Sequence, residues 1–236
     1  DALGLPTWAP NGVVVCSAYG DQITPGLVPD GQGGAIIAWR DKRDEVANGS
    51  DIFAQRIDAA GAVVWQNNGV PISVARHNQY DNCIASDGQG GAIIAWNNYS
   101  GGASDWDIYA QRIDGAGVVQ WAANGVPAGD GQGFGQYYPA ICPDGDGGAI
   151  IAWADYASGT DWDIYAQRLD AAGAKCWAAD GLGVCTVPTM ESKPFVAADG
   201  AGGAVIAWED HRNGRQDIYA QSIAHDGAIR WPAAGV

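Results

Sequence analysis

Basic residues are scarce in this sequence. Lysine and arginine together number 12 among 236 residues, against 27 aspartates and glutamates, so the formal net charge is −15 and the sequence pI is about 4.2. A chain of that charge repels phosphate backbones and anionic lipid headgroups. The composition therefore argues against nucleic acid as a partner and against binding to a membrane surface.

Long apolar runs are also missing. No stretch approaches the roughly 20 apolar residues that a membrane helix needs, so we expect no membrane insertion. No signal-peptide pattern is present, and the sequence starts at Asp1 rather than at methionine, which fits a processed, exported product. Low lysine content and the NxS triplets at Asn48 and Asn98 favour the same interpretation. We predict a secreted protein, extracellular or on the cell surface.

Cysteine is rare as well. None of the five cysteines forms a CxxC or CxxxC pair, which argues against a zinc site, and we expect no metal there. Cys176 and Cys185 flank a turn, CWAADGLGVC, and are the best candidates for a disulfide. The alternative is that all five cysteines are small buried apolar residues.

An internal repeat dominates what is present. Its second copy reads DGQGGAIIAWNNYSGGASDWDIYAQRIDGAGVVQW, and the copies begin at Asp30, Asp87, Asp144 and Asp199, which are 57, 57 and 55 residues apart. A period in this range is typical of architectures in which each unit buries its faces against its neighbours. We therefore expect one array of about four units.

Each unit carries four strand signals and no apolar period of helical length. An extended piece such as YYPAIC precedes a DGxGG turn, in which Asp-Gly favours a two-residue hairpin. The apolar GAIIAW, the alternating DIYAQRID and a last strand that ends at tryptophan follow. Four antiparallel strands with two apolar faces predict a propeller blade. The predicted fold class is all-β: a four-bladed propeller, each blade a four-stranded antiparallel sheet.

The chain holds one repeat tail more than four blades need. TWAPNGVVVC near the start matches VWQNNGVPIS, which follows a repeat. We predict a single domain over residues 1–236, with an extra tail at 1–21 and blades at approximately 22–72, 79–128, 136–184 and 191–236. Because exposed strand edges invite pairing between chains, residues 1–26 are expected to contact another subunit or module.

The pattern IYAQRLDAAGAKCW, Ile164–Trp177, resembles the repeats of PQQ-type propellers. The wider pattern is similar to tandem repeats of large secreted bacterial proteins. The resemblance implies a propeller in which the tryptophan of the outer strand docks between blades. It implies no quinone site, because nothing here matches one and no vicinal cysteine pair is present.

Most tryptophans recur on the repeat, which is typical of core or inter-blade packing. A structural docking role is predicted for Trp65, Trp121, Trp177, Trp231, Trp39, Trp96, Trp153 and Trp208. Trp106 and Trp162 depart from this grid, in the loops SDWD and TDWD. They are either loop anchors or platforms for a sugar ring, with carboxylates accepting its hydroxyl hydrogens.

Aspartates cluster in the same loops. Those that recur in every unit are expected to accept hydrogen bonds from turn backbone, and the recurring arginines to pair with them and lock the blades. The candidate ligand-binding carboxylates are Asp105, Asp107, Asp161 and Asp163, and the same four are alternative calcium ligands. No other cofactor is expected.

The symmetric repeats contain no unrepeated cluster of acids, histidine or arginine, so we expect no catalytic residue and no enzyme activity. The favoured function is a non-catalytic structural or interaction module with protein partners or self-association, as part of a longer or self-assembling array. The alternative is a carbohydrate-binding, lectin-like propeller that binds glycans through Trp106 and Trp162. A propeller hydrolase or dehydrogenase is the third interpretation.

Overall fold

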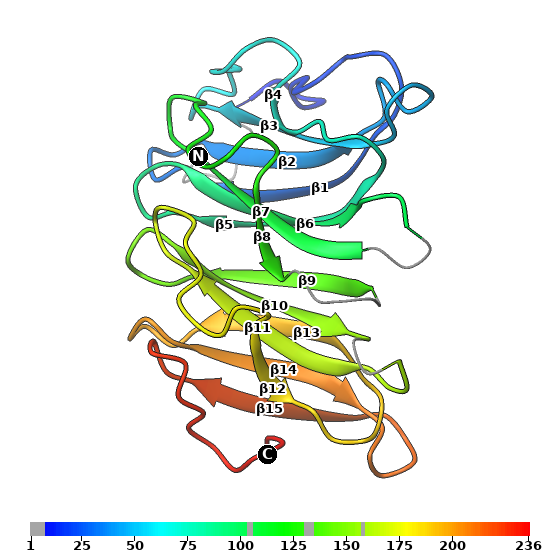
Figure 1. The fold of residues 1–236 in the computed structure, drawn as a ribbon. Helices are drawn as coiled ribbons and strands as arrows, with labels where there is room; N and C mark the ends of the chain where they lie inside the picture. Colours follow the sequence, from blue (N-terminus) through cyan, green and yellow to red (C-terminus); the bar gives the residue numbers. More distant parts are fainter. Residues whose placement is uncertain (1–7, 103–105, 130–134, 157–158) are drawn as a thin grey trace.

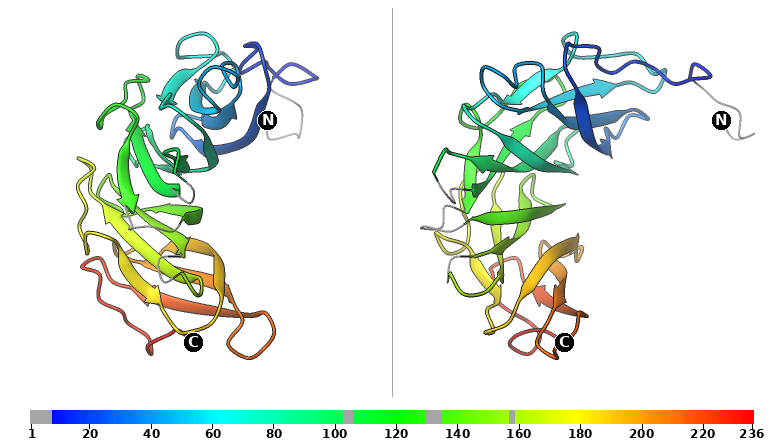
Figure 2. Two further views of the ribbon diagram at one scale, coloured as in Figure 1. Left: turned by 45° about the vertical axis from the view of Figure 1, so that its right-hand side comes forward. Right: turned by 90° about the vertical axis from the view of Figure 1, so that its right-hand side faces the viewer.

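The computed structural model describes residues 8–102, 106–129, 135–156 and 159–236. Strands and turns make up this part of the chain, which contains no helix and so none that could span a membrane. Four antiparallel sheets follow one another along an arc, with the first blade at one end and the last at the other (Figures 1 and 2). The predicted all-β fold of four blades is confirmed.

The sheets follow the repeat. Blade 1 consists of β1 (Gln22–Pro29), β2 (Ala35–Asp41), β3 (Asp51–Ile57) and β4 (Val70–Ser73). Blade 2 consists of β5 (Gln79–Ser86), β6 (Ala92–Tyr99), β7 (Trp106–Ile113) and β8 (Val126–Gly129). Blade 3 consists of β9 (Gln136–Pro143), β10 (Ala149–Asp155), β11 (Asp163–Leu169) and β12 (Leu182–Cys185). Blade 4 consists of β13 (Glu191–Ala198), β14 (Ala204–Asp210) and β15 (Asp217–Ile223). In blade 4, Ala220 and Val236 exchange backbone hydrogen bonds where the other blades have their fourth strand.

The first strand of each blade lies on the concave side of the arc, where β1, β5, β9 and β13 contact one another in turn (Figure 2). The later strands lie progressively outward. Trp106, the first residue of β7, and Trp162, just before β11, lie on the same rim, where both rings contact Tyr137.

The turn between the first two strands is longer than predicted. Asp30 opens a five-residue loop, and its Oδ1 accepts hydrogen bonds from the backbone N–H groups of Gln32 and Gly34, both at 2.8 Å. Gly31 and Gly33 adopt positive φ of 75° and 88°. The expected two-residue hairpin is therefore wrong, because the aspartate side chain itself closes the loop.

The fourth strand also differs from its prediction. Val63, just before Trp65, makes only an isolated bridge, and the strand β4 begins after the tryptophan. A buried glutamine holds this bend: Gln55 Oε1 accepts the backbone N–H of Trp65 at 2.9 Å, and its Nε2 donates to Gln66 O at 2.7 Å. The equivalents Gln111, Gln167 and Gln221 make the same bonds in the other blades.

A tryptophan joins each of the first three blades to the next, and an arginine does the same in blades 1 and 2. Trp65 Nε1 donates to Gly115 O of blade 2 at 3.1 Å. Arg56 donates to Asp30 in its own blade at 2.9 Å and to the same Gly115 O at 3.0 Å. Trp121 and Arg112 repeat these contacts on Ala171 O of blade 3. The tryptophans that end each repeat thus take part in inter-blade contacts, except in the last blade.

The N-terminal tail occupies the place of a preceding blade's end. Trp8 Nε1 donates to Ala59 O of blade 1 at 2.9 Å, as Trp65 does to blade 2. The backbone N–H of Ser17 donates to Asn68 Oδ1 at 2.9 Å. Residues 8–18 therefore pack on the blade of their own chain, and the expected contact with another subunit or module stays a prediction.

Candidate functional site

The tryptophan that ends each second strand is anchored by the aspartate two residues later. Trp39 Nε1 donates to Asp41 at 2.8 Å, and Trp153 Nε1 donates to Asp155 at 3.1 Å. Trp39, Trp96, Trp153 and Trp208 are all buried. In blade 2 the aspartate is replaced by Asn98, and the buried Trp96 Nε1 has no hydrogen-bond partner. These residues form a framework rather than a site.

Trp106 lies in a cluster of aromatic rings on the rim. It stacks on Tyr99 and Tyr80, with ring centroids 4.8 and 5.1 Å apart, and is tilted against Tyr137 at 6.0 Å. Arg40 of blade 1 covers the Tyr80 ring at 3.8 Å. Trp106 is half-buried and has contacts to blades 2 and 3, so it acts as an anchor between them.

Trp162 continues this aromatic array into blade 3 and borders open space. Its ring lies 5.1 Å from Tyr156 and 5.3 Å from Tyr137. On another side it lines a hollow of about 530 Å³, together with Thr160, Asp161 and a segment at the entrance to blade 4, Pro188–Met190. The two off-grid tryptophans thus belong to one array, and Trp162 is the one beside a hollow.

The candidate carboxylates divide between surface and interior. Asp105 lies outside the described residues. Asp107 is half-buried and Asp161 lines the hollow beside Trp162. Asp163 is buried, and burial, together with the neighbouring Asp161 and Asp155, raises its pKa to about 6. The described members of the predicted calcium set do not converge with a third metal-binding side chain.

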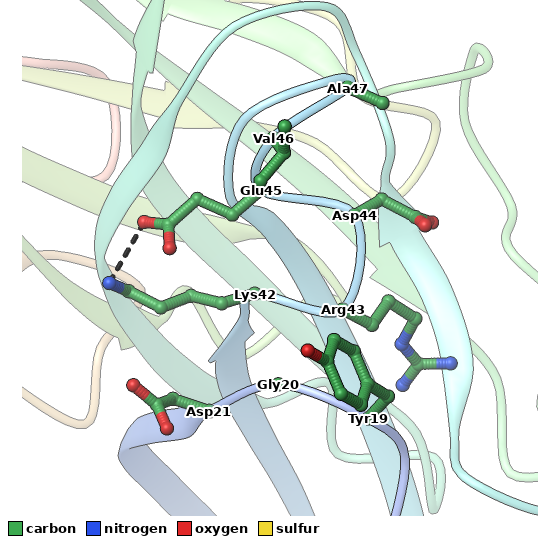
Figure 3. Close-up of a pocket in the computed structure, with 9 residues that line it drawn as sticks. All are labelled: Tyr19, Gly20, Asp21, Lys42, Arg43, Asp44, Glu45, Val46 and Ala47. Atoms are coloured by element: carbon green, nitrogen blue, oxygen red, sulfur yellow. Dashed lines mark ion pairs between the residues drawn. The ribbon is translucent and has the colours of Figure 1, made fainter.

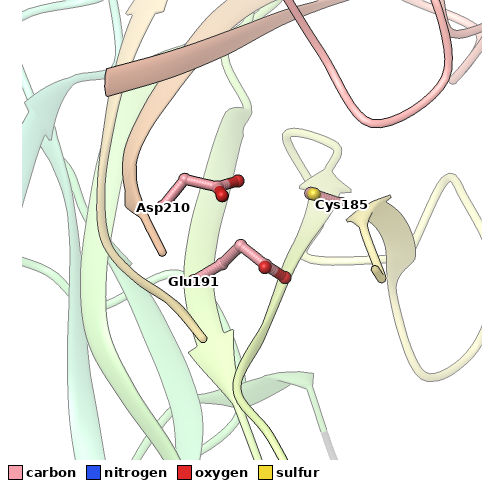
Figure 4. Close-up of side chains that lie close together, drawn as sticks. All are labelled: Cys185, Glu191 and Asp210. Atoms are coloured by element: carbon pink, nitrogen blue, oxygen red, sulfur yellow. The ribbon is translucent and has the colours of Figure 1, made fainter. Parts of the chain in front are cut away.

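Figure 4 shows a buried cluster of two carboxyl groups and a thiol. It is linked to the residues of the hollow by the backbone N–H of Glu191, which donates to Trp162 O at 2.9 Å. Ligand atoms of Cys185, Glu191 and Asp210, from three different strands, lie within 4.8 Å of one another. Burial raises the pKa of Glu191 to about 7, although Thr189 Oγ1 donates to its carboxyl at 2.6 Å. Its Oε2 has no hydrogen-bond partner. The sequence analysis did not predict this cluster. Its signal in the sequence was Glu191, because the other three blades carry glutamine at the equivalent position.

The cluster holds a proton more readily than a metal. Arg212 Nη2 donates to Asp210 and to Cys185 Sγ, the latter at 3.3 Å, so a positive charge is already present. Burial opposes ionisation of Asp210, but the hydrogen bonds from Arg212 and Trp208 outweigh it and lower the pKa. A neutral Glu191 beside an ionised Asp210 is the arrangement expected when two carboxyls share a buried site.

The predicted disulfide is not formed. All five cysteines, which lie within the described residues, are free thiols. Cys176 is exposed before Trp177, whereas Cys185 is buried against Arg212 on β12. The bend after Trp177 turns the chain away between them, and a covalent bridge would have to replace the arginine contact.

A second hollow lies on the concave side and was also missed. Each innermost strand contains a bulge at which a non-glycine residue has a φ of 49° to 58°. The residues at this position differ: Thr24, Asp81, Tyr138 and Lys193. They line a groove of about 580 Å³ with Phe195. The backbone is the same at this position in all four blades, but the side chain differs. An alignment of the four repeat units would have shown this variable position.

A third hollow, of about 600 Å³, lies on the blade 1 rim (Figure 3). Both of its basic side chains are paired: Lys42 Nζ lies 2.8 Å from Glu45, and Arg43 pairs with the buried Asp41 at 2.7 Å. Tyr19 is the one aromatic ring that lines it. It offers fewer stacking surfaces than the hollow beside Trp162.

No protein-family model matches this sequence, and no curated protein matches it. Solved structures do. An α-L-arabinofuranosidase from Lactobacillus brevis has a TM-score of 0.50 and 11% identity, over 89% of this chain and 75% of that one. An α-L-arabinofuranosidase from Fusarium graminearum, in complex with an iminosugar inhibitor, has a TM-score of 0.54 and 12% identity, over 88% and 68%. A Penicillium chrysogenum α-L-arabinanase complexed with arabinobiose has a TM-score of 0.52 and 14% identity, over 89% and 66%.

These likenesses establish a β-propeller fold. They do not support the finer resemblance to PQQ-type repeats. The expectations of a non-catalytic structural module and of no enzyme activity are contradicted, because the three solved structures named above, which share this fold, are two arabinofuranosidases and an arabinanase. A framework that repeats in every blade is therefore no ground for excluding enzyme activity.

Proposed function

We propose that this propeller binds carbohydrate on its rim, in the hollow that Trp162 shares with Asp161. The observation that carries the proposal is the continuous aromatic array that ends at this hollow. An indole face packs against the C–H groups of a sugar ring, while carboxylate and hydroxyl groups bond its hydroxyls. The alternative function drawn from the sequence is thus the better supported one.

The substrate class that we propose is a pentose-containing oligosaccharide. Two of the similar solved structures hold arabinobiose or an iminosugar inhibitor. The hollow of about 530 Å³ is within the range of small-ligand sites. The net charge of −15 suits a neutral ligand better than an acidic one. A polysaccharide target would also agree with the proposed location outside the cell.

Binding can be tested with two matched variants. Trp162→Ala and Trp106→Ala remove the same side chain from equivalent positions of the repeat, but only Trp162 borders the hollow. Titration calorimetry with arabino- and xylo-oligosaccharides should show at least tenfold weaker binding for Trp162→Ala, with little change for Trp106→Ala. Equal binding by all three proteins, or no binding by the wild type, would overturn the proposal.

Glycoside hydrolysis at the same hollow is the second candidate function. It is favoured by Asp163, whose pKa of about 6 lets it keep a proton in mildly acidic solution, next to Asp161, the carboxylate that lines the hollow. A proton donor and a carboxylate are the pair that glycosidic cleavage requires. Release of reducing ends from arabinan or xylan should be lost in both Asp161→Asn and Asp163→Asn. Binding without any release would leave carbohydrate binding alone.

A further inference from the structure

The innermost strand of each blade carries a bulge at the same place in the repeat. In blade 1 the register with the second strand shifts between Ile23 and Gly26, and it shifts at the equivalent points of β5, β9 and β13. At each bulge a residue other than glycine adopts a left-handed φ, a conformation that a side chain disfavours. Strained backbone of this kind gathers at ligand sites. The four bulges therefore mark the concave groove of about 580 Å³, which their side chains line, as a candidate binding site.

The concave groove is lined mainly by apolar side chains. Ile84, Ile141 and Val196 occupy the same position in successive blades, and each is half-buried. Asp81 and Tyr138 line the groove from β5 and β9, and each of these strands contacts another innermost strand on both sides (Figure 2). The groove is thus a hydrocarbon surface with polar groups at the bulges.

One charge in the concave groove has no counter-charge. Among the described residues that line it, Asp81 and Lys193 carry a charge. Lys193 Nζ lies 3.2 Å from Glu209 Oε2, so its charge is matched within blade 4. The side chain of Asp81 has no ion pair or hydrogen bond within the described part of the chain. The Cys83 thiol adds no charge, because burial raises its pKa to about 12. An unmatched carboxylate in an apolar groove favours a positively charged ligand.

Aromatic rings favour the same kind of ligand. Tyr138 lines the groove with 46% of the residue exposed, and Phe195 lines it from blade 4. The face of an aromatic ring attracts a cation, while an aliphatic surface gains free energy by covering hydrocarbon. An ammonium group on a hydrocarbon body therefore suits the carboxylate, the ring and the aliphatic residues together.

We propose that the concave groove binds a small organic cation of the alkylammonium class, with Asp81 as its counter-ion and Tyr138 in contact with its charged end. The formal net charge of −15 attracts such a ligand and repels acids. The groove shares no lining residue with the hollow beside Trp162. This inference therefore goes beyond the proposed carbohydrate binding and does not depend on it.

NMR titration of the full chain tests the inference with three matched probes. n-Hexylammonium chloride, n-hexanol and sodium hexanoate share one hydrocarbon chain and differ in charge. Hexylammonium should cause saturable shifts at the backbone amides of Asn82 and Tyr138 and bind at least about tenfold more tightly than hexanol, with no saturation by hexanoate. Nα-acetyl-lysine amide presents the same ammonium group on a peptide. Its affinity relative to hexylammonium shows whether a lysine side chain or a free amine is the better ligand.

Matched variants separate the groove from the overall charge. Asp81→Asn should weaken hexylammonium binding at least about tenfold and leave hexanol binding unchanged. Tyr138→Ala should weaken it as well. Asp226→Asn removes one negative charge from an exposed residue outside the groove and should have no effect. Lys193→Met should leave binding unchanged or tighten it, because it removes a cation from the groove.

Three results would overturn the inference. The first is equal affinity for hexylammonium and hexanol, or saturation by neither probe. The second is an Asp81→Asn protein that binds hexylammonium as tightly as the wild type. The third is an equal loss in Asp226→Asn, because binding would then follow net charge alone. Asp81 and Tyr138 are exposed, so both variants should fold, and circular dichroism verifies this.

Discussion

At the scale of single residues, Glu191 is the one departure from a repeated glutamine that changes the chemistry of its surroundings. Gln136, its equivalent in blade 3, donates Nε2 to Asp155 at 2.8 Å. A carboxyl at this position can donate in the same way only while it is protonated. A carboxyl whose burial favours its neutral form therefore stands where a neighbouring blade has an amide.

This carboxyl predicts a pH effect on stability. The unfolded carboxyl ionises near pH 4.5 and the folded one near pH 7, so stability from this group is present below pH 4.5 and is lost as the pH rises to about 7. Glu191→Gln cannot ionise. Relative to wild type, the melting temperature of this variant should be several degrees higher at pH 8 and nearly unchanged at pH 4.5. A difference that is constant across this range would contradict the raised pKa.

A second prediction concerns the unpaired indole of Trp96. Asn98→Asp supplies the carboxylate that Trp39, Trp153 and Trp208 already bond, so we expect a gain of about 1 kcal/mol in the free energy of unfolding. Urea unfolding measures it. Asp155→Asn is the reciprocal control and should cost about 1–3 kcal/mol. Destabilisation by both changes would show that burial of the charge outweighs the new bond.

At the scale of the structural element, an arginine ties a turn of its own blade to the next blade in blades 1 and 2. Arg112 bonds the buried Asp87 at 3.0 Å and Ala171 O of blade 3 at 3.2 Å. Arg112→Met leaves that carboxylate without its cation, and we expect a loss of about 3–5 kcal/mol in urea unfolding. Arg215, whose pair with Asp217 is exposed, is the control; Arg215→Met should cost under about 1 kcal/mol. Similar losses would contradict the inter-blade role.

The repeat pattern predicted most strands but not how they end. DIYAQRID and GAIIAW contain their own periodicity, so the second and third strands of each blade follow from sequence. The fourth strand did not, because its position depends on the bend that Gln55 holds across ten residues. The bulge of the innermost strands was equally hidden, since Thr24 and Lys193 do not favour a positive φ by themselves.

At the scale of the whole molecule, equivalent tryptophans contribute different amounts to the free energy of unfolding, depending on the blade in which they lie. Trp121 is covered by blade 3, whereas Trp231 is uncovered. Trp121→Ala should cost roughly 3–5 kcal/mol as a large-to-small change in a packed interface. Trp231→Ala should cost well under half of that, measured by urea unfolding at low protein concentration. Equal costs would mean that the tryptophan stabilises its own blade rather than the contact.

The sequence alone determined the architecture of this protein. A unit that recurs every 57 or 55 residues, with tryptophan and glutamine at constant places, encodes a blade that must pack on its neighbours, because the pattern is local and is repeated. Only the tertiary structure decided what the variable residues do. The hollow beside Trp162 needs Pro188–Met190 from the entrance to the next blade, and the concave groove is lined by the innermost strands of all four blades. Contacts between residues of different blades do not repeat along the chain, so no periodic sequence pattern predicts them.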